Sequence, residues 1–279
     1  MKSIKQKKRI VDIISLIILT IGAVIMIFPF TWMFFTAFKD TPESVHTPPT
    51  WFPHNGWHPE NFPKVFEMAP FGRYFINTVI VSVLHAVLTL LISIFAAYAL
   101  SLLKFHGSSA VLMFFIATMM VPGEILLIQN YVTVAKIGWM DTYMGIIVPS
   151  LASGMYIYML RETFMQVPIA LHKAAKMDGC SDWRYLWRVL VPTSTSTLST
   201  IGLLSFIGQW NSYLWPLMVT NHEEMRVLTL GLIRFNAGAS TRINLQMAAS
   251  LLVVLPIIVL FLIFRKKIIE GVASGGIKG

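Results

Sequence analysis

Residues 74–103 read YFINTVIVSVLHAVLTLLISIFAAYALSLL, a run of 30 residues that contains no lysine, arginine, aspartate or glutamate. A helix of about 17–25 apolar residues crosses the hydrocarbon core of a bilayer, so this run is long enough to span a membrane with some tilt. The segment therefore predicts a transmembrane helix.

The composition of the whole chain extends that prediction. Of the 279 residues, 56% are hydrophobic and 13% are charged, whereas an ordinary soluble domain carries about 25% charged residues. So few charges could not cover so much apolar surface in water. We therefore expect an all-α integral membrane protein. Cys180 is the one cysteine, which excludes an internal disulfide framework.

Five further stretches are long and apolar enough to span. The six predicted transmembrane helices cover approximately residues 10–38, 74–103, 109–129, 142–160, 193–220 and 243–264, and the third is interrupted by Pro122, Gly123 and Glu124. No internal repeat of the kind found in two-half secondary transporters is evident. We therefore treat residues 1–279 as a single transmembrane domain.

The basic residues set the predicted orientation. Fifteen of the 22 lysines and arginines lie in the two terminal tails, at Lys104 and in the 161–192 loop, and seven lie on the opposite side. By the positive-inside rule, both termini and the 161–192 loop are cytoplasmic, and 39–73 and 221–242 are outer loops. The net charge of +9 is thus a topology signal rather than a sign of nucleic-acid binding. The first apolar run is too long for a signal peptide and lacks an A-x-A-like site, so we expect a retained anchor.

The outer loop at 39–73 is predicted to be irregular. Seven prolines stand between residues 42 and 70, and proline at that density stops helices. Trp51 and Trp57 in the same loop favour the membrane interface.

The cytoplasmic loop at 161–192 predicts two short helices. Pro168 is suited to a first helical position, residues 170–177 have high helix propensity, and Gly179 can end the helix at a positive φ. Ser181 or Asp182 can cap the second helix. The apolar stripe expected on that second helix consists of Trp183, Leu186, Trp187 and Leu190. Taken alone, the loop is compatible with a linker that packs on its own bundle.

Sequence signatures of catalysis are missing. The glycine-rich tail approaches a Walker A loop, but Ile277 stands where the lysine belongs. The seven histidines have no metal-ligand spacing, there is no G-x-S-x-G elbow, and Cys180 has no evident catalytic partner. We expect a chain that is not an enzyme, with no metal site and no cofactor of its own.

Two sets of polar residues lie inside predicted spans. Glu124 marks a functional site by default, since an ionisable group in a membrane is costly, but it could also satisfy the broken helix or lie at the outer interface. The span-five residues whose amides and aromatic rings could hold a sugar are Gln209, Trp210, Asn211 and Tyr213. The same side chains suit helix–helix contacts and an aromatic belt. Asn77 and His85 are expected to make helix–helix contacts.

Residues 173–180 (KAAKMDGC), followed by Pro192, resemble the cytoplasmic "EAA" loop of bacterial ABC importer permeases. Residues 122–125 (PGEI), 210–217 (WNSYLWPL) and 271–279 (GVASGGIKG) resemble the maltose-type carbohydrate uptake family in particular. The likeness covers essentially the whole chain. It departs from the family pattern at Lys173, where the family has glutamate, and at Cys180, where it has alanine.

This resemblance implies the six-span fold of type I ABC importer permeases in a bacterial cytoplasmic (inner) membrane. It implies a permease subunit of an ATP-driven, binding-protein-dependent importer of a sugar or oligosaccharide. The partners would be a sister permease, an ATPase dimer that binds ATP and Mg, and an extracytoplasmic solute-binding protein that contacts the 221–242 loop.

The family also implies roles for particular residues. Coupling to the ATPase would use the 168–190 loop, through Lys173, Ala174, Ala175, Met177, Asp178, Gly179 and Pro192. The tail residues placed against the ATPase would be Gly275, Gly276 and Lys278. The alternatives are the same machine with glycerol phosphate or a polyol as cargo, and, more remotely, a standalone channel or membrane scaffold.

Overall fold

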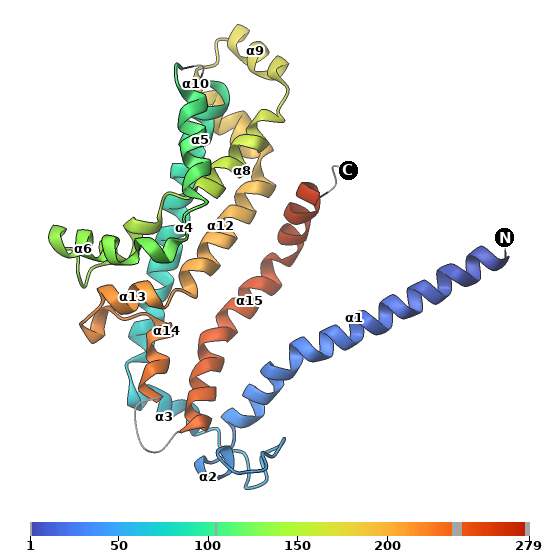
Figure 1. Cartoon of the computed structure of the whole chain (residues 1–279), viewed down its shortest axis with the longest axis vertical. Coiled ribbons are helices and arrows are strands. Elements are labelled where there is room, and N and C mark those ends of the chain that lie inside the picture. Colours follow the sequence, from blue (N-terminus) through green and yellow to red (C-terminus); the bar gives the residue numbers. More distant parts are fainter. Residues whose placement is uncertain (1, 104, 236–241, 277–279) are drawn as a thin grey trace. The chain divides into compact units, whose positions relative to one another are not determined.

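The structure is a computed structural model that describes residues 2–103, 105–235 and 242–276 (Figure 1). Over these residues every regular element is a helix, which confirms the all-α fold class. The chain divides into two compact units. Unit 1 consists of residues 1–71 and 231–256, and unit 2 consists of residues 72–230 and 257–279.

Unit 1 is built on two long helices. Its elements are α1 (Lys2–Ala37), α2 (Thr41–Ser44), α3 (Asn61–Met68), η5 (Leu232–Phe235) and the first part of α15 (Ile243–Gly276). α1 is 36 residues long, and none of the residues in its most apolar window is buried inside the chain. Its apolar surface therefore needs a lipid or protein environment to cover it.

The segment between α1 and α4 is more ordered than the proline content predicts. The expectation of an irregular loop is wrong at α3, which includes Pro63 in its first turn. Proline is tolerated there because the first N–H groups of a helix have no intrahelical acceptor. The Asp40 side chain caps α2 by accepting a hydrogen bond from Glu43 N at 2.8 Å.

Glu43 holds the rest of that segment in place. Its buried carboxylate accepts hydrogen bonds from Thr50 Oγ1 at 3.0 Å and His54 N at 2.8 Å. Burial raises the pKa of this carboxyl, but the hydrogen bonds and the nearby Lys39 ammonium outweigh that effect and leave the pKa lowered. Lys39 donates to the carbonyl of Thr50, so both charged groups stabilise the same turn.

Unit 2 contains α4 (Phe71–Leu102), nearly the predicted 74–103 span, and a set of shorter helices. These are α5 (Ser108–Thr118), η1 (Gly123–Leu126), α6 (Leu127–Ile137), α7 (Tyr143–Ile147), η2 (Val148–Ser150), α8 (Gly154–Met165), α9 (Ile169–Met177), α10 (Asp182–Tyr185), η3 (Leu186–Leu190), α11 (Val191–Thr193), α12 (Thr195–Trp210), α13 (Leu214–Val219), η4 (Glu223–Met225) and α14 (Leu228–Gly231).

Among the residues that the structure describes, three helices are long and apolar enough to cross a membrane: Ile10–Ala37, Phe71–Leu102 and Ile243–Ile263. Three bent pairs also qualify if each pair is one span. In the first pair, Ser108–Thr118 and Gly123–Ile137 meet at 93°, so that α6 runs across the direction of α4 (Figure 1). The break after Thr118 coincides with the predicted interruption at Pro122, Gly123 and Glu124.

The structure adds two interruptions that the sequence analysis did not name. In the predicted span 142–160, Tyr143–Ser150 and Gly154–Met165 meet at 54°, and Ser153 caps the new helix. Gly154 lies at the break because a Cβ atom there would lie 2.5 Å from the Phe115 carbonyl oxygen. In the predicted span 193–220, α12 ends at Trp210 and α13 begins at Leu214.

One buried cluster in unit 2 joins α4, α8, α10, η3 and α12. Its members are Ile94, Ala97, Tyr98, Leu160, Phe164, Tyr185, Leu186, Leu190 and Ile201. This core fixes the segment that follows α9 against the long helices, so α9 is attached to a rigid base.

Candidate functional site

α9 is a short helix in which no side chain is buried. It begins at Ile169, one residue after the predicted start at Pro168, which is its N-cap, and it is followed by Gly179 at φ +71°, as the sequence predicts. Cys180 N donates to the Ala175 carbonyl oxygen at 2.9 Å and Asp178 N to that of Ala174 at 3.0 Å. These bonds satisfy carbonyls at the helix end, and the positive φ of Gly179 permits the reversal that makes them.

The residues that the resemblance assigns to coupling do not all lie on one surface. Lys173, Ala174, Met177, Asp178 and Gly179 are exposed together on α9 and the turn after it. Ala175 is half-buried and packs against the unit 2 core. Pro192 lies apart from them in sequence, exposed within α11. Small side chains on an exposed helix leave room for the close approach of another surface.

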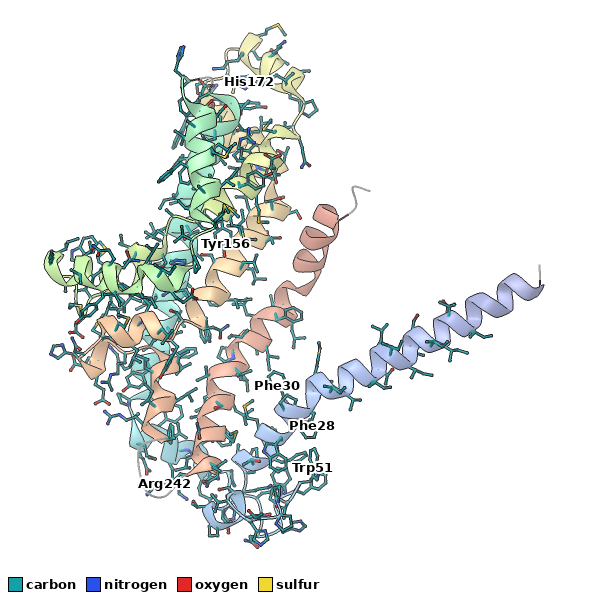
Figure 2. All side chains as sticks on the ribbon, in the orientation of Figure 1. Phe28, Phe30, Trp51, Tyr156, His172 and Arg242 are labelled. Carbon is teal, nitrogen blue, oxygen red and sulfur yellow. The ribbon has the colours of Figure 1, made fainter. Side chains whose placement is uncertain are left out.

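Asp182 fastens α9 to the long helix α4. Its Oδ1 accepts a hydrogen bond from the Tyr98 hydroxyl at 2.9 Å and forms an ion pair with Lys176 Nζ at 2.8 Å. Nearby, the rings of His172 and Tyr185 meet edge to face at 4.7 Å, and Figure 2 labels His172 on α9. The sequence carries no signal for this arrangement, since Tyr98 and Asp182 are 84 positions apart.

The predicted apolar stripe after α9 is only partly correct. Leu186 and Leu190 are buried, but Trp183 is 64% exposed and Tyr185 is buried instead. The cause is that Leu186–Leu190 forms a π-helical turn, which is wider than the α-helical turn on which the stripe was based. Trp183 instead stacks on Phe95 with ring centroids 5.9 Å apart.

Glu124 lies in η1 at the break of the third predicted span. Its side chain is exposed, and no hydrogen bond or ion pair joins its carboxylate to the residues that the structure describes. The alternative that Glu124 satisfies the broken helix therefore finds no support among these contacts. The predicted role in the substrate path stays a prediction.

The four span-five candidates do not form one cluster. Trp210 is 2% exposed and contacts Phe75 and Phe206 through its ring. Asn211 and Tyr213 are exposed at the end of α12 and in the following turn. Gln209 is the member of this set that lines a cavity of unit 2.

That cavity has a volume of about 340 Å³ and lies among α4, η2, α8, α12 and α13. His85 lines this cavity: one ring nitrogen is 2.9 Å from Ser205 Oγ, and the other is 3.2 Å from the Ser150 carbonyl oxygen and 3.1 Å from Ser150 Oγ. The helix–helix contact expected for His85 is thus confirmed. Sequence reasoning did not identify the cavity, because its walls come from segments far apart in the sequence, from His85 in α4 to Trp215 in α13.

Asn77 holds the segment that follows α13. Its buried amide nitrogen donates to the carbonyl oxygens of Glu224 at 2.7 Å and Arg226 at 2.9 Å, and its amide oxygen accepts from the Tyr143 hydroxyl at 2.8 Å. These bonds confirm the contact role expected for Asn77. They also fix the first part of the predicted outer loop on α4.

Asp141 holds the same segment from the α6–α7 turn. Its carboxylate accepts hydrogen bonds from Asn221 N at 2.6 Å and His222 N at 2.8 Å. Burial raises the pKa of Asp141, but these bonds and the contact with the His222 ring outweigh burial and lower the pKa overall. Asp141 itself adopts φ +56°, which is uncommon for a residue with a side chain.

Two further predictions concern the tail and metals. Gly275 and Gly276 close α15, and Lys278 lies outside the described residues. Over the residues described, no group of three or more histidine, cysteine, aspartate or glutamate side chains is placed to hold a metal ion.

Residues 89–268 match the family model described as binding-protein-dependent transport system inner membrane component. The chain belongs to this family. Its members are the permeases of ABC importers, so the resemblance found in the sequence is confirmed, and the relatives are named as transport permeases rather than as enzymes.

Three curated relatives cover nearly the whole chain. The probable ABC transporter permease protein YurM of Bacillus subtilis is 31% identical, over 90% of this chain and 84% of the relative. The arabinooligosaccharides transport system permease protein AraQ of Halalkalibacterium halodurans is 28% identical, over 94% and 96%. The sn-glycerol-3-phosphate transport system permease protein UgpE of Yersinia pestis is also 28% identical, over 96% and 98%.

Two solved structures share the fold. One is a bacterial ABC transporter involved in the import of the acidic polysaccharide alginate, with a TM-score of 0.83, 22% identity and coverage of 92% of this chain and 96% of that chain. The other is the bacterial alginate ABC transporter in complex with its pentasaccharide-bound periplasmic protein, with a TM-score of 0.69, 16% identity and coverage of 95% and 97%. At these identities the likeness establishes the ABC importer permease fold.

Proposed function

We propose that this chain is one of two permease subunits of an ATP-driven, binding-protein-dependent importer of a sugar or oligosaccharide. It forms the translocation path with a sister permease, and an ATPase dimer on the cytoplasmic side binds ATP and Mg and performs the hydrolysis. The chain itself holds no cofactor and catalyses no reaction. An extracytoplasmic solute-binding protein delivers the cargo to the 221–242 loop.

The observation that carries this proposal is the exposed α9 on a fixed base. A helix that drives a conformational change must be open to its partner on one side and firmly attached on the other. Ala174 and Gly179 supply the open side, and the Asp182 contacts to Tyr98 and Lys176 supply the attachment. ATP-driven closure of the ATPase would move α9 and α4 together and shift the permease between inward-facing and outward-facing states.

The proposed topology has six spans in a bacterial cytoplasmic membrane, with both termini in the cytoplasm. It is supported by the three long apolar helices, by the three bent pairs when each is taken as one span, and by the uneven distribution of lysine and arginine. The domain is treated as a single transmembrane permease, with the coupling loop at 161–192 and outer loops at 39–73 and 221–242.

The cargo is proposed to be a carbohydrate, since AraQ is named for arabinooligosaccharides and the solved neighbours for alginate. The second candidate is glycerol phosphate or a polyol, which the name of UgpE favours. An affinity screen of the cognate solute-binding protein against neutral sugars, polyols and glycerol 3-phosphate separates these candidates.

The test of the assembly is purification in mild detergent through a tag on this chain, followed by mass spectrometry of everything recovered. A second permease and an ATPase in stoichiometric amounts are the expected result. A folded, homogeneous chain recovered without them would contradict the proposal and favour a channel or scaffold.

Three residue roles within the proposal have tests of their own. Lys173 reverses the charge of the family glutamate, so Lys173→Glu is expected to leave docking intact and to change only the rate of coupled transport.

Glu124→Gln is expected to slow uptake if Glu124 lines the path. Deletion of residues 268–279 is expected to reduce transport if Gly275, Gly276 and Lys278 reach the ATPase, and unchanged transport would refute that role.

A further inference from the structure

The cavity lined by Gln209 in unit 2 contains a polar group that has no partner among the described residues. Gln209 is 9% exposed, and its side-chain amide nitrogen makes no hydrogen bond to the described residues. A buried donor left unpaired destabilises a fold, so such a group generally has a partner that the protein chain does not supply. Gln209 lines the cavity, and an occupant of the cavity can accept its hydrogen bond.

The His85 contacts orient a second group at the same cavity. One ring nitrogen of His85 lies 2.9 Å from Ser205 Oγ, and the other lies 3.2 Å from the Ser150 carbonyl oxygen and 3.1 Å from Ser150 Oγ. A serine hydroxyl has one hydrogen and two lone pairs, and the contact with His85 uses one of these in Ser205. The Ser205 hydroxyl therefore keeps the capacity for a further hydrogen bond with an occupant.

Two aromatic rings complete the wall. Tyr156 and Trp215 both line the cavity, and Figure 2 shows Tyr156 between the α9 end of unit 2 and α13. The indole N–H of Trp215 is already used, since it donates to the Gly145 carbonyl oxygen at 3.1 Å. The ring of Trp215 thus offers an apolar surface rather than a donor.

None of the described residues that line this cavity is lysine, arginine, aspartate or glutamate. An anionic ligand such as a phosphate ester or a uronate needs charged donors for tight recognition, and this wall has none. Neutral donors and acceptors beside aromatic rings match a ligand with many hydroxyl groups and apolar ring faces. The volume of about 340 Å³ is at the small end of ligand sites, which span roughly 300–1,000 Å³.

We infer that this cavity is a binding subsite for one neutral sugar ring, with the Gln209 amide as hydrogen-bond donor and the Ser205 hydroxyl as a second hydrogen-bonding group. The inference rests on the proposed transport function and narrows its cargo to uncharged sugars. It also assigns a cargo contact to this chain itself, in addition to whatever the sister permease provides.

The test measures binding directly on the purified complex in nanodiscs, without the solute-binding protein. The probes are D-glucose, D-galactose, L-arabinose and glycerol 3-phosphate. The binding of each probe is measured by saturation-transfer difference NMR. Gln209→Met keeps the length of the side chain but removes the amide, and Ser205→Ala removes the hydroxyl. Ser93→Ala is the matched control, because the Ser93 hydroxyl is also buried and unpaired among the described residues but does not line the cavity.

The expected result is saturable binding of at least one neutral sugar and none of glycerol 3-phosphate. Gln209→Met should weaken that binding about five- to tenfold and Ser205→Ala about threefold, as the loss of neutral hydrogen bonds does. Ser93→Ala should bind as the wild type does. Melting temperatures of all variants, measured in the same nanodiscs, separate a loss of binding from a loss of fold.

The inference is overturned if no neutral sugar binds, if folded Gln209→Met and Ser205→Ala bind sugar normally, or if glycerol 3-phosphate occupies the site. These outcomes are separate from failure of the proposed function. That failure appears earlier, as recovery of this chain without an ATPase, and the recovered protein can still be tested for sugar binding.

Discussion

Helices α1 and α4 are both long and apolar enough to cross a membrane, but the protein buries them to different extents. In the most apolar window of each, no residue of α1 is buried inside the chain, against 39% for α4. The polar residues of α4 that are buried are Asn77, Thr78, Ser82, His85, Thr89 and Ser93. In α1, the exposed Thr20 bonds only to the Leu16 carbonyl oxygen one turn earlier.

This comparison separates two properties of a membrane helix. Apolar length determines whether a helix can span, and both α1 and α4 meet this condition. Polar side chains determine which face meets other protein, because polar groups without partners are costly in hydrocarbon. Substitutions in the two helices should therefore have very different effects, even where they look equivalent in sequence.

The largest expected effect is at Asn77. Asn77→Leu leaves two backbone carbonyls and the Tyr143 hydroxyl without their bonds, so unfolding in mixed micelles should become easier by about 3 kcal/mol or more. Thr20→Val in α1 is the comparison variant, with an expected change within about 0.5 kcal/mol. Equal effects of the two substitutions would contradict the distinction between the helices.

Alanine substitutions at two glycines, one in α8 and one in α1, should change stability by a smaller amount and again more in unit 2 than in α1. A Cβ atom at Gly154 would lie 2.5 Å from the Phe115 carbonyl oxygen, whereas one at Gly22 of α1 would meet nothing within 4 Å. Gly154→Ala should destabilise the protein by about 1–3 kcal/mol through overpacking. Gly22→Ala should be neutral or stabilise by up to about 1 kcal/mol, since alanine favours the helix. Thermal melting of both variants in detergent is the measurement.

The smallest effect is the pH dependence at Asp141, which lies outside the spans. The pKa of this carboxyl is lower in the folded protein than its ordinary value of about 3.9. Its contribution to stability is therefore fully present above that value and is lost as the pH falls through the lowered folded pKa. Asp141→Asn should flatten the acid limb of a stability–pH profile, and an unchanged acid limb would show that the contacts to Asn221 and His222 contribute little.

The sequence was sufficient to predict those parts of the fold that residues close together in the chain determine. The apolar run of α4, the break at Pro122 and Gly123 and the end of α9 before Gly179 all depend on residues within one or two turns. The chain also carried enough of its family motifs for the family to be identified. These features are local, so contacts elsewhere in the chain do not alter them.

Long-range contacts determine the rest. The break before Gly154 depends on the backbone of α5, and the buried position of Tyr185 depends on a π-helical turn packed against α4 and α8. The Tyr98–Asp182 bond and the cavity around Gln209 join residues that are more than 60 positions apart. Periodicity in a single sequence does not encode such pairings. The Tyr98–Asp182 bond and the cavity around Gln209 therefore could not be predicted.

The central claim, that α9 couples this permease to its ATPase, is tested most directly by a pair of glycine substitutions. Gly179 and Gly138 each follow a helix at positive φ, +71° and +78°, with open space where a Cβ atom would lie. Gly179→Trp and Gly138→Trp therefore impose a similar backbone strain, but Gly179 alone lies beside the exposed coupling surface of α9. The measurement is ATP-dependent uptake by the reconstituted complex, with assembly checked by co-purification. Loss of uptake in Gly179→Trp, with uptake kept in Gly138→Trp, is the predicted result, and wild-type uptake in an assembled Gly179→Trp complex would contradict the account.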